Sequence, residues 1–321
     1  MIIPQSAVIA AVALALCVSH CVADAADHPR PNIPRPNIIV ILVDDLRWDD
    51  IGCAGHPIVR TPHIDRLAYE GARFRNAFCN TPLCSPARAC LLTGLYTKNH
   101  GIRDNTDRSE QSYRLQTFPR ELQAAGYETG YVGKWHMGND ASARPGFDHW
   151  VGIKGQGTSF NPELNINGKF VSHEGHTTDV LNRYAAEFAG RERETPFCLY
   201  VAQKALHPEL IQYDDGSISD PSAARFLPAQ RHEGLYRDDP IPRRLNVTDD
   251  ISDKPALQLE IEGLPPLSRA TGTDDETIRD RLRMLAAVDE GVGMLLKSLK
   301  ESKKLDDTIF VFTSDNGYWY G

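Results

Sequence analysis

The sequence predicts an α/β fold in which a mostly parallel sheet is covered by helices on both faces. Short apolar runs recur along the chain, and the segments between them carry helical capping and stop signals. Strands that alternate with helices favour parallel pairing, because each crossover helix packs against one face of the sheet. A third observation is that polar residues directly follow each apolar run. In open sheets of this kind, ligands bind beyond the carboxyl ends of the strands.

The predicted strands are apolar runs without polar alternation, which indicates burial on both faces. They span residues 37–43, 129–133, 197–202 and 308–312. Helices are predicted from caps and stops at residues 62–70, 117–125, 178–188 and 276–300. The last of these repeats apolar residues on one face at helical spacing. The connection from His207 to Thr273 is rich in Pro, Asp and Arg, and predicts surface loops around a cleft.

The composition is that of a globular protein, since the 321 residues are 41% hydrophobic and 24% charged. These values exclude a disordered, collagen-like or coiled-coil chain, and the length favours about two domains. Lys and Arg number 35 against 43 Asp and Glu, so the net charge is −8. The chain therefore lacks the basic surplus that binds a phosphate backbone, and nucleic acid is not expected as a partner.

Residues 1–25 have the pattern of a secretory signal peptide. The apolar run 7–18 is too short to span a bilayer, and Ala23-Asp24-Ala25 provides the small residues of a cleavage site before Ala26. An uncleaved N-terminal anchor is the alternative. No later run approaches the roughly 18 apolar residues of a membrane span. We therefore expect an exported protein, periplasmic or secreted, without stable membrane insertion. Five cysteines remain after cleavage, and this odd number leaves at least one outside an intramolecular disulfide.

The polar residues after the predicted strands form four groups that parallel pairing would bring to one edge of the sheet. They are Asp44-Asp45, Lys134-Trp135-His136, Lys204 with His207, and Ser314-Asp315-Asn316-Gly317. Taken alone, the first group also fits a helix N-cap, and the last also fits a tight turn. Together they predict a functional site.

Oxygen ligands dominate this predicted site. Asp44, Asp45 and Asp315 supply carboxylates, and Asn316 supplies an amide oxygen. Such a set suits a hard divalent cation, calcium or magnesium. Zinc fits poorly, because Cys79, Cys84 and Cys90 lack paired C-x-x-C spacing.

A short helix is predicted directly after Cys84, with Ser85 as N-cap, Pro86 in the first turn and Gly94 as the stop. Cys84 then lies at the positive end of the helix dipole, and Arg88 adds a cationic fork suited to a tetrahedral oxyanion. The alternatives for Cys84 are a disulfide with Cys79 or Cys90, or a buried thiol.

The segment 84–88 resembles the C-x-P-x-R signature of the type I, formylglycine-dependent sulfatases, which belong to the alkaline-phosphatase-like superfamily. Three further segments resemble this family in the same order. Residues 37–45 resemble its first strand with the metal-binding Asp pair, residues 133–136 its K-x-H element, and residues 313–317 its second metal motif. The resemblance runs from about residue 36 to residue 321.

This resemblance implies a mechanism. A formylglycine-generating enzyme would oxidise Cys84 to formylglycine, whose hydrate attacks sulfur. Arg88 and Lys134 would anchor the modified side chain and the sulfate. His207 would protonate the leaving oxygen, and His136 would take a proton from the remaining hydroxyl. One calcium ion would be held by the modified Cys84 together with Asp44, Asp45, Asp315 and Asn316.

The family resemblance also bears on the substrate. Residues 99–105 and 134–138 resemble the branch that acts on carbohydrate sulfates, including glucosamine-6-sulfate. The expected substrate is a sulfated carbohydrate or an aryl sulfate ester, although Asp104-Asn105 also fits a polar turn. Two other readings remain open. One is a phosphodiesterase or phosphonate monoesterase on the same scaffold. The other is a non-catalytic fragment that binds anions or glycans.

Comparison with the family pattern also predicts the domain organisation. Residues 26–321 correspond to an N-terminal catalytic sulfatase domain. The second sulfate-binding lysine and the C-terminal subdomain of the family have no counterpart in this sequence. We therefore expect this chain to be an incomplete sulfatase that, taken alone, is weakly stable and poorly active.

Overall fold

The computed structural model describes residues 35–220, 224–244, 250–260 and 272–320. The chain divides into two compact units, Met1–Arg35 and Pro36–Gly321. The predicted signal peptide lies outside the described residues. Every described helix and strand belongs to the second unit.

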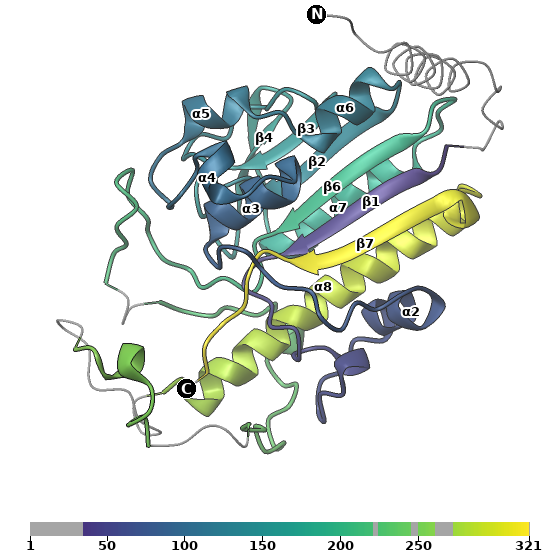
Figure 1. The fold of residues 1–321 in the computed structure, drawn as a ribbon. Helices are drawn as coiled ribbons and strands as arrows, with labels where there is room; N and C mark the ends of the chain where they lie inside the picture. Colours follow the sequence, from purple (N-terminus) through teal and green to yellow (C-terminus); the bar gives the residue numbers. More distant parts are fainter. Residues whose placement is uncertain (1–34, 221–223, 245–249, 261–271, 321) are drawn as a thin grey trace, which may run out of the picture. The chain divides into compact units, whose positions relative to one another are not determined.

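In the described part of the chain, seven strands form one sheet in the order β5-β4-β3-β2-β6-β1-β7 (Figure 1). Their bounds are β1 Asn37–Val43, β2 Glu128–Lys134, β3 His149–Ile153, β4 Glu163–Ile166, β5 Lys169–Ser172, β6 Phe197–Gln203 and β7 Thr308–Ser314. The neighbouring strands β3, β2, β6, β1 and β7 run parallel to one another. The strand β4 pairs antiparallel with both β3 and β5. The mostly parallel sheet is therefore confirmed. β1, β2, β6 and β7 are the four predicted strands, whereas β3, β4 and β5 were not predicted from the sequence.

The helices connect and cover these strands. They are α2 Pro62–Glu70, α3 Cys84–Thr93, α4 Thr97–His100, α5 Ser109–Arg114, α6 Phe118–Ala124, α7 Thr177–Gly190 and α8 Asp275–Glu301, with short 3-10 turns at Gly52–Ala54, Gln230–His232, Pro255–Gln258 and Leu305–Asp307. The long helix α8 begins where the Asp274 side chain accepts a hydrogen bond from the Thr277 amide, at 2.9 Å. Among the described residues, no helix has the length and apolarity needed to cross a bilayer.

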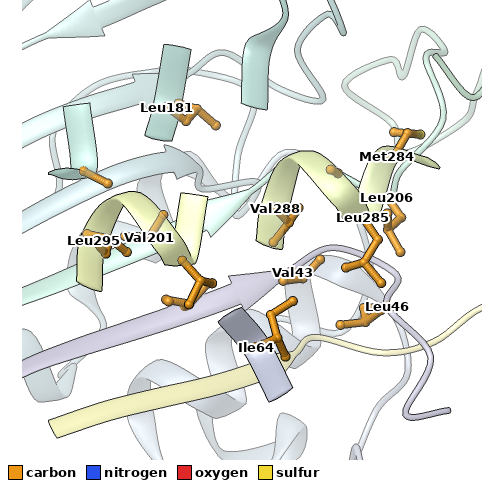
Figure 2. Close-up of a cluster of buried hydrophobic side chains, with 14 of the residues drawn as sticks. Val43, Leu46, Ile64, Leu181, Val201, Leu206, Met284, Leu285, Val288 and Leu295 are labelled. Carbon is orange, nitrogen blue, oxygen red and sulfur yellow. The ribbon is translucent and has the colours of Figure 1, made fainter. Parts of the chain in front are cut away.

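The alternation of side chains along the strands builds a core on each face of the sheet. In β1, Ile39, Ile41 and Val43 contribute to a cluster with apolar residues of α2, α7 and α8. Figure 2 shows part of this cluster, in which Val43 and Val201 of the sheet lie among residues of the helices. Leu42 belongs to the second cluster, on the opposite face, with residues of α3 and aromatic residues of β2, β3 and β6. Both faces of the central strands are therefore covered, as predicted.

The prediction of burial on both faces is wrong for β7. Among the residues that the structure describes, this strand lies at the edge of the sheet and pairs only with β1. Its Ile309 and Val311 side chains are 51% and 44% exposed. An apolar run indicates that a strand can be buried, but its position in the sheet decides whether both faces are covered.

Candidate active site

The carboxyl ends of β1, β6 and β7 lie side by side, because Val43 pairs with Gln203 on one side and with Ser314 on the other. The residue that follows the strand is Asp44 after β1, Lys204 after β6 and Asp315 after β7. The strand β2 joins the group through Lys134, its last residue, which forms an ion pair with Asp44. The sequence prediction that polar groups meet at one edge of the sheet agrees with this geometry.

Three carboxylates form the centre of this cluster. One oxygen each of Asp44, Asp45 and Asp315 lies within 4.8 Å of the others, and all three residues are buried. The Asp45 amide donates a hydrogen bond to Asp315 Oδ1 at 3.1 Å, so the ends of β1 and β7 are tied together. Asn316 lies beside the group, and its Nδ2 donates to Asp315 Oδ1 at 2.9 Å.

Two buried cations contact the carboxylates. Arg88 Nη2 lies 3.2 Å from Asp44 Oδ1 and 2.8 Å from Asp315 Oδ2. The Lys134 ammonium pairs with the other oxygen of Asp44, and the Lys134 carbonyl accepts a hydrogen bond from Arg88 Nη1. The two cations therefore link α3 and β2 to the carboxylates at the ends of β1 and β7.

The pKa values of the three carboxyl groups differ because these cations are unevenly distributed. Burial opposes ionisation of Asp44, but Lys134 and Arg88 outweigh it and hold the Asp44 pKa well below its usual range. Burial and the Asp44 charge raise the pKa of Asp45 to about 6. The same two causes raise the pKa of Asp315 well above its usual value. The three groups therefore lack enough positive charge nearby for all of them to ionise readily.

The donor set fits a hard divalent cation. Three carboxylates whose oxygens converge within 4.8 Å suit the oxygen coordination of calcium or magnesium. A divalent charge would also allow Asp45 and Asp315 to ionise together with Asp44. The residues that could hold the ion are Asp44, Asp45 and Asp315, with Asn316 adjacent.

Cation binding is expected to weaken as the pH falls through about 6. The raised pKa of Asp45 means that its carboxyl group is protonated below that value, and a proton then competes with the ion. The Asp45 proton alone reduces the affinity about tenfold at pH 5 relative to pH 7, and the raised pKa of Asp315 adds to this loss. Calorimetric titration with calcium at several pH values measures this change. An affinity that stays constant from pH 7 to pH 5 would contradict the cluster as the binding site.

Cys84 begins helix α3 and points toward the carboxylates. Its Sγ lies 3.6 Å from Asp44 Oδ1, and the residue is buried. Burial and the Asp44 charge raise the pKa of the thiol well above its ordinary value. The five described cysteines are all free, so the disulfide alternative for Cys84 finds no support. An unmodified Cys84 would remain a neutral thiol and therefore a weak nucleophile.

Ser85 is not the N-cap of this helix, which corrects the prediction. The cap position is Leu83, and the Ser85 hydroxyl instead donates to the carbonyl of His136. The Ser85 amide is satisfied from another segment, by Asn105 Oδ1 at 3.0 Å. Tertiary contacts thus replace the local cap. Gly94 ends the helix in the left-handed conformation, as predicted.

The two predicted histidines occupy different surroundings. His207 Nδ1 hydrogen-bonds to the Pro208 carbonyl at 2.8 Å, and a ring nitrogen of His207 lies within 4.8 Å of ligand atoms of Asp44 and Cys84. His136 Nε2 lies 2.6 Å from Gln212 Oε1, and its Nδ1 is buried without a partner. Burial, and next the charge of Lys134, lower the pKa of both histidines well below the usual value.

A pocket of about 300 Å³ lies over the cluster. Its lining includes Asp45, Cys84, His207 and Asn316, together with the amide side chains of Asn105, Gln156 and Gln212. No sequence pattern marks the two glutamines, because they lie in irregular segments. Asp104 accepts hydrogen bonds from Thr106 and Arg108, which agrees with the polar-turn interpretation of that residue.

Gly133 is required for the close approach of β2 to β6. Its φ is +129°, and a Cβ atom at this position would lie 1.9 Å from the Ala202 carbonyl oxygen. We expect Gly133→Ala to destabilise the fold by about 3 kcal/mol or more, because backbone must move on both strands. Gly55→Ala is the matched control, since Gly55 also has a positive φ of +93° but no atom within 4 Å of its Cβ position. Denaturant unfolding that gave equal losses for both variants would contradict the steric explanation.

The comparisons with known proteins identify the family. A family model described as Sulfatase matches residues 36–320. The chain belongs to the sulfatase family. The chain is 30% identical to an N-acetylglucosamine-6-O-sulfatase of Bacteroides thetaiotaomicron, over 93% of the chain and 61% of the relative. It is 31% identical to an ulvan-active sulfatase of Formosa agariphila, over 89% of the chain and 51% of the relative.

A solved structure supports the same assignment. The chain matches a protein that was solved in complex with its substrate D-glucosamine-2-N,6-O-disulfate, with a TM-score of 0.70 and 28% identity. The match covers 89% of this chain and 68% of the solved one. The chain thus spans between half and two thirds of the length of the curated relatives described above.

Proposed function

We propose that the protein hydrolyses sulfate esters of a carbohydrate, using an oxidised Cys84 beside a bound calcium ion. The observation that carries the proposal is the position of Cys84. Its thiol is buried 3.6 Å from Asp44, at the edge of a cluster of three carboxylates. A neutral thiol in such surroundings is poorly suited to attack an anionic ester, whereas a hydrated aldehyde at the same position offers two hydroxyl groups.

Asp44, Asp45, Asp315 and Asn316 are the proposed calcium ligands, together with the modified Cys84. Bound there, the ion would polarise a sulfate oxygen and favour ionisation of a nearby hydroxyl group. Arg88 and Lys134 contribute fixed positive charge at the two oxygens of Asp44. Their role is to bind the modified side chain and the anionic sulfate group.

The proton transfers are assigned to the two histidines. One hydroxyl of the hydrated Cys84 aldehyde would give its proton to a carboxylate of the cluster and attack sulfur. The bond between sulfur and the alcohol oxygen would break, and His207 would donate a proton to that oxygen. The second hydroxyl would then give its proton to His136, the bond between carbon and the sulfate oxygen would break, and the aldehyde would form again. Both histidines have lowered pKa values in the free protein, so His136 is neutral and able to accept a proton. The negative charge of a bound sulfate ester favours the protonated form of His207.

The proposed substrate is a sulfated sugar, with a 6-O-sulfated glucosamine as the first candidate. The support comes from the relative that acts as an N-acetylglucosamine-6-O-sulfatase and from the neighbour solved with a glucosamine disulfate. The pocket beside Cys84 carries the amide groups of Asn105, Gln156 and Gln212. Amides that both donate and accept hydrogen bonds suit the hydroxyl groups of a sugar.

Export is part of the same proposal. Residues 1–25 carry the pattern of a signal peptide. We propose that a formylglycine-generating enzyme oxidises Cys84 during export. Fractionation of expressing cells tests it, with the mature protein expected outside the cytoplasm and lacking residues 1–25. Full-size protein retained in the cytoplasm would contradict it.

Co-expression of the full-length protein with a formylglycine-generating enzyme tests the activity. Glucosamine-6-sulfate, an aryl sulfate and an aryl phosphate diester are compared at equal concentration. We expect release of sulfate from the first two, with turnover that is lost on chelation of calcium. Faster hydrolysis of the phosphate diester would favour a phosphodiesterase. Binding of the sulfated sugar without any turnover would favour a glycan-binding protein.

A further inference from the structure

Arg281, on helix α8, is a completely buried cation without a carboxylate partner among the described residues. Its guanidinium stacks over the Tyr318 ring at 4.0 Å. It donates hydrogen bonds to the Asp45 carbonyl at 2.7 Å, to the Leu206 carbonyl at 3.0 Å and to the Tyr320 hydroxyl at 3.2 Å. Burying an arginine is costly unless hydrogen bonds compensate for the lost water, so these contacts explain its position.

The two carbonyls that Arg281 binds lie just beyond the ends of β1 and β6. The backbone pairing of these strands continues past their last register pair through two hydrogen bonds. The Asp44 amide donates to the Ala205 carbonyl at 3.0 Å, and the Leu206 amide donates to the Asp44 carbonyl at 2.7 Å. One residue further along each strand, Arg281 bridges the carbonyls in place of a direct bond. The segments that carry Asp45 and His207 are thus joined through one side chain.

Lys204 holds the same loop from another side. It is buried, and its Nζ lies 3.3 Å from the His207 carbonyl and 3.2 Å from the Pro208 carbonyl. The Pro208 carbonyl also accepts the hydrogen bond from His207 Nδ1. Each carbonyl of residues 206 to 208 is therefore bound by a buried cation. Arg281 binds the first, and Lys204 binds the other two. This arrangement fixes the backbone around His207 and leaves Nε2 as the ring nitrogen available to a substrate.

We propose that Arg281 and Lys204 are positioning residues, which hold the Asp45 backbone and the His207 imidazole in register beside Cys84. The proposal rests on the function assigned above to Asp45 and His207. Neither cation needs to touch the substrate for this role. Arg281 links the proposed cation ligand to the proposed proton donor, so its loss affects both cation binding and proton donation.

Arg283 provides a matched control on the same helix. It is also buried, but it pairs with Glu276 and Asp280 and donates to the Leu235 carbonyl. None of these partners belongs to the site. Arg283→Lys therefore makes the same chemical change in α8 without altering the loops that carry Asp45 and His207.

The test compares Arg281→Lys, Lys204→Met and Arg283→Lys in the full-length protein. Arg281→Lys keeps the charge but cannot bridge two carbonyls and a hydroxyl in the same way. Proton donation matters most for a poor leaving group, so an alkyl sugar sulfate should suffer more than an aryl sulfate. For both site variants we expect kcat/KM to fall about 100-fold on glucosamine-6-sulfate and about tenfold or less on the aryl sulfate. Arg283→Lys should leave the ratio of the two rates unchanged.

Calcium titration provides a second measurement that does not depend on turnover. We expect Arg281→Lys to weaken calcium binding about tenfold, because the Asp45 backbone loses a hydrogen bond. The net charge of the protein is the same in the variant, so a change in charge does not explain the loss. Equal losses on both substrates together with unchanged calcium affinity would overturn the proposal. If the wild-type protein hydrolyses neither ester, the proposed function fails and the calcium titration alone decides the role of Arg281. If Arg281→Lys does not fold, the substrate ratio of Lys204→Met decides the claim.

Discussion

Cys84→Ala is expected to abolish hydrolysis of sulfate esters while leaving the fold and the four other proposed calcium ligands in place. The proposed nucleophile derives from this side chain, so kcat/KM should fall by about 10³-fold or more. Alanine suits the first turn of a helix. The three carboxylates keep their mutual contacts, because none of them depends on the Cys84 sulfur.

The control for this variant is Cys198→Ala. Cys198 is also buried, but it lies within β6 rather than at a strand end. The Cys198→Ala variant should keep most of the activity and lose only a little stability. Steady-state kinetics on glucosamine-6-sulfate and calcium titration of all three proteins make the comparison. A Cys84→Ala protein that retained a tenth of the wild-type rate would contradict the assigned nucleophile.

Asp315→Asn is expected to remove the response of the protein to calcium. The substitution keeps the size of the side chain but deletes one of three converging carboxylates, and it deprives Arg88 of its 2.8 Å partner. We expect calcium affinity and kcat/KM each to fall about 100-fold or more. In the wild-type protein, calcium at 1,000 times its dissociation constant should stabilise the fold by about 4 kcal/mol. Asp315→Asn should lose most of that gain at the same concentration.

Asp289→Asn separates this effect from a general loss of buried charge. Asp289 is buried on α8, where Oδ1 accepts hydrogen bonds from the amides of His63 and Ile64 at the start of α2. Its substitution should alter stability without changing the increase in melting temperature on adding calcium. Thermal unfolding with calcium and with a chelator gives both values. If Asp315→Asn kept the wild-type calcium response, the carboxylate cluster would not be the binding site.

The parts of the fold that could be predicted from the sequence are those with a strong local pattern, such as an apolar run or a helix cap. The run from Asn37 to Val43 is apolar throughout, and the structure gives a strand with the same bounds. The helix predicted at 276–300 extends by only one residue at each end, because Asp274 caps its start. Asp44 and Asp315 follow such strands directly, and Lys134 is the last residue of one. Parallel pairing then brings Asp44, Lys134 and Asp315 together without any further assumption.

The remaining features depend on contacts between distant segments. Arg281 lies on an amphipathic helix, and nothing in its neighbours along the chain indicates that it binds the carbonyls of Asp45 and Leu206. Gln212 reaches His136 from an irregular loop. Ser85 has the residue type of a helix cap, but the carbonyl of His136 offers its hydroxyl a partner from another segment. Local propensity could not predict these hydrogen bonds, because they depend on the tertiary packing of distant segments.

Peptide mass spectrometry of the exported, co-expressed protein measures whether Cys84 is oxidised to an aldehyde. The peptide that contains Cys84 should carry an aldehyde in place of the thiol, resist alkylation by iodoacetamide and react with an aminooxy probe. The peptide that contains Cys198 provides the internal standard for an unmodified cysteine. An active protein in which Cys84 is alkylated as completely as Cys198 would contradict the account.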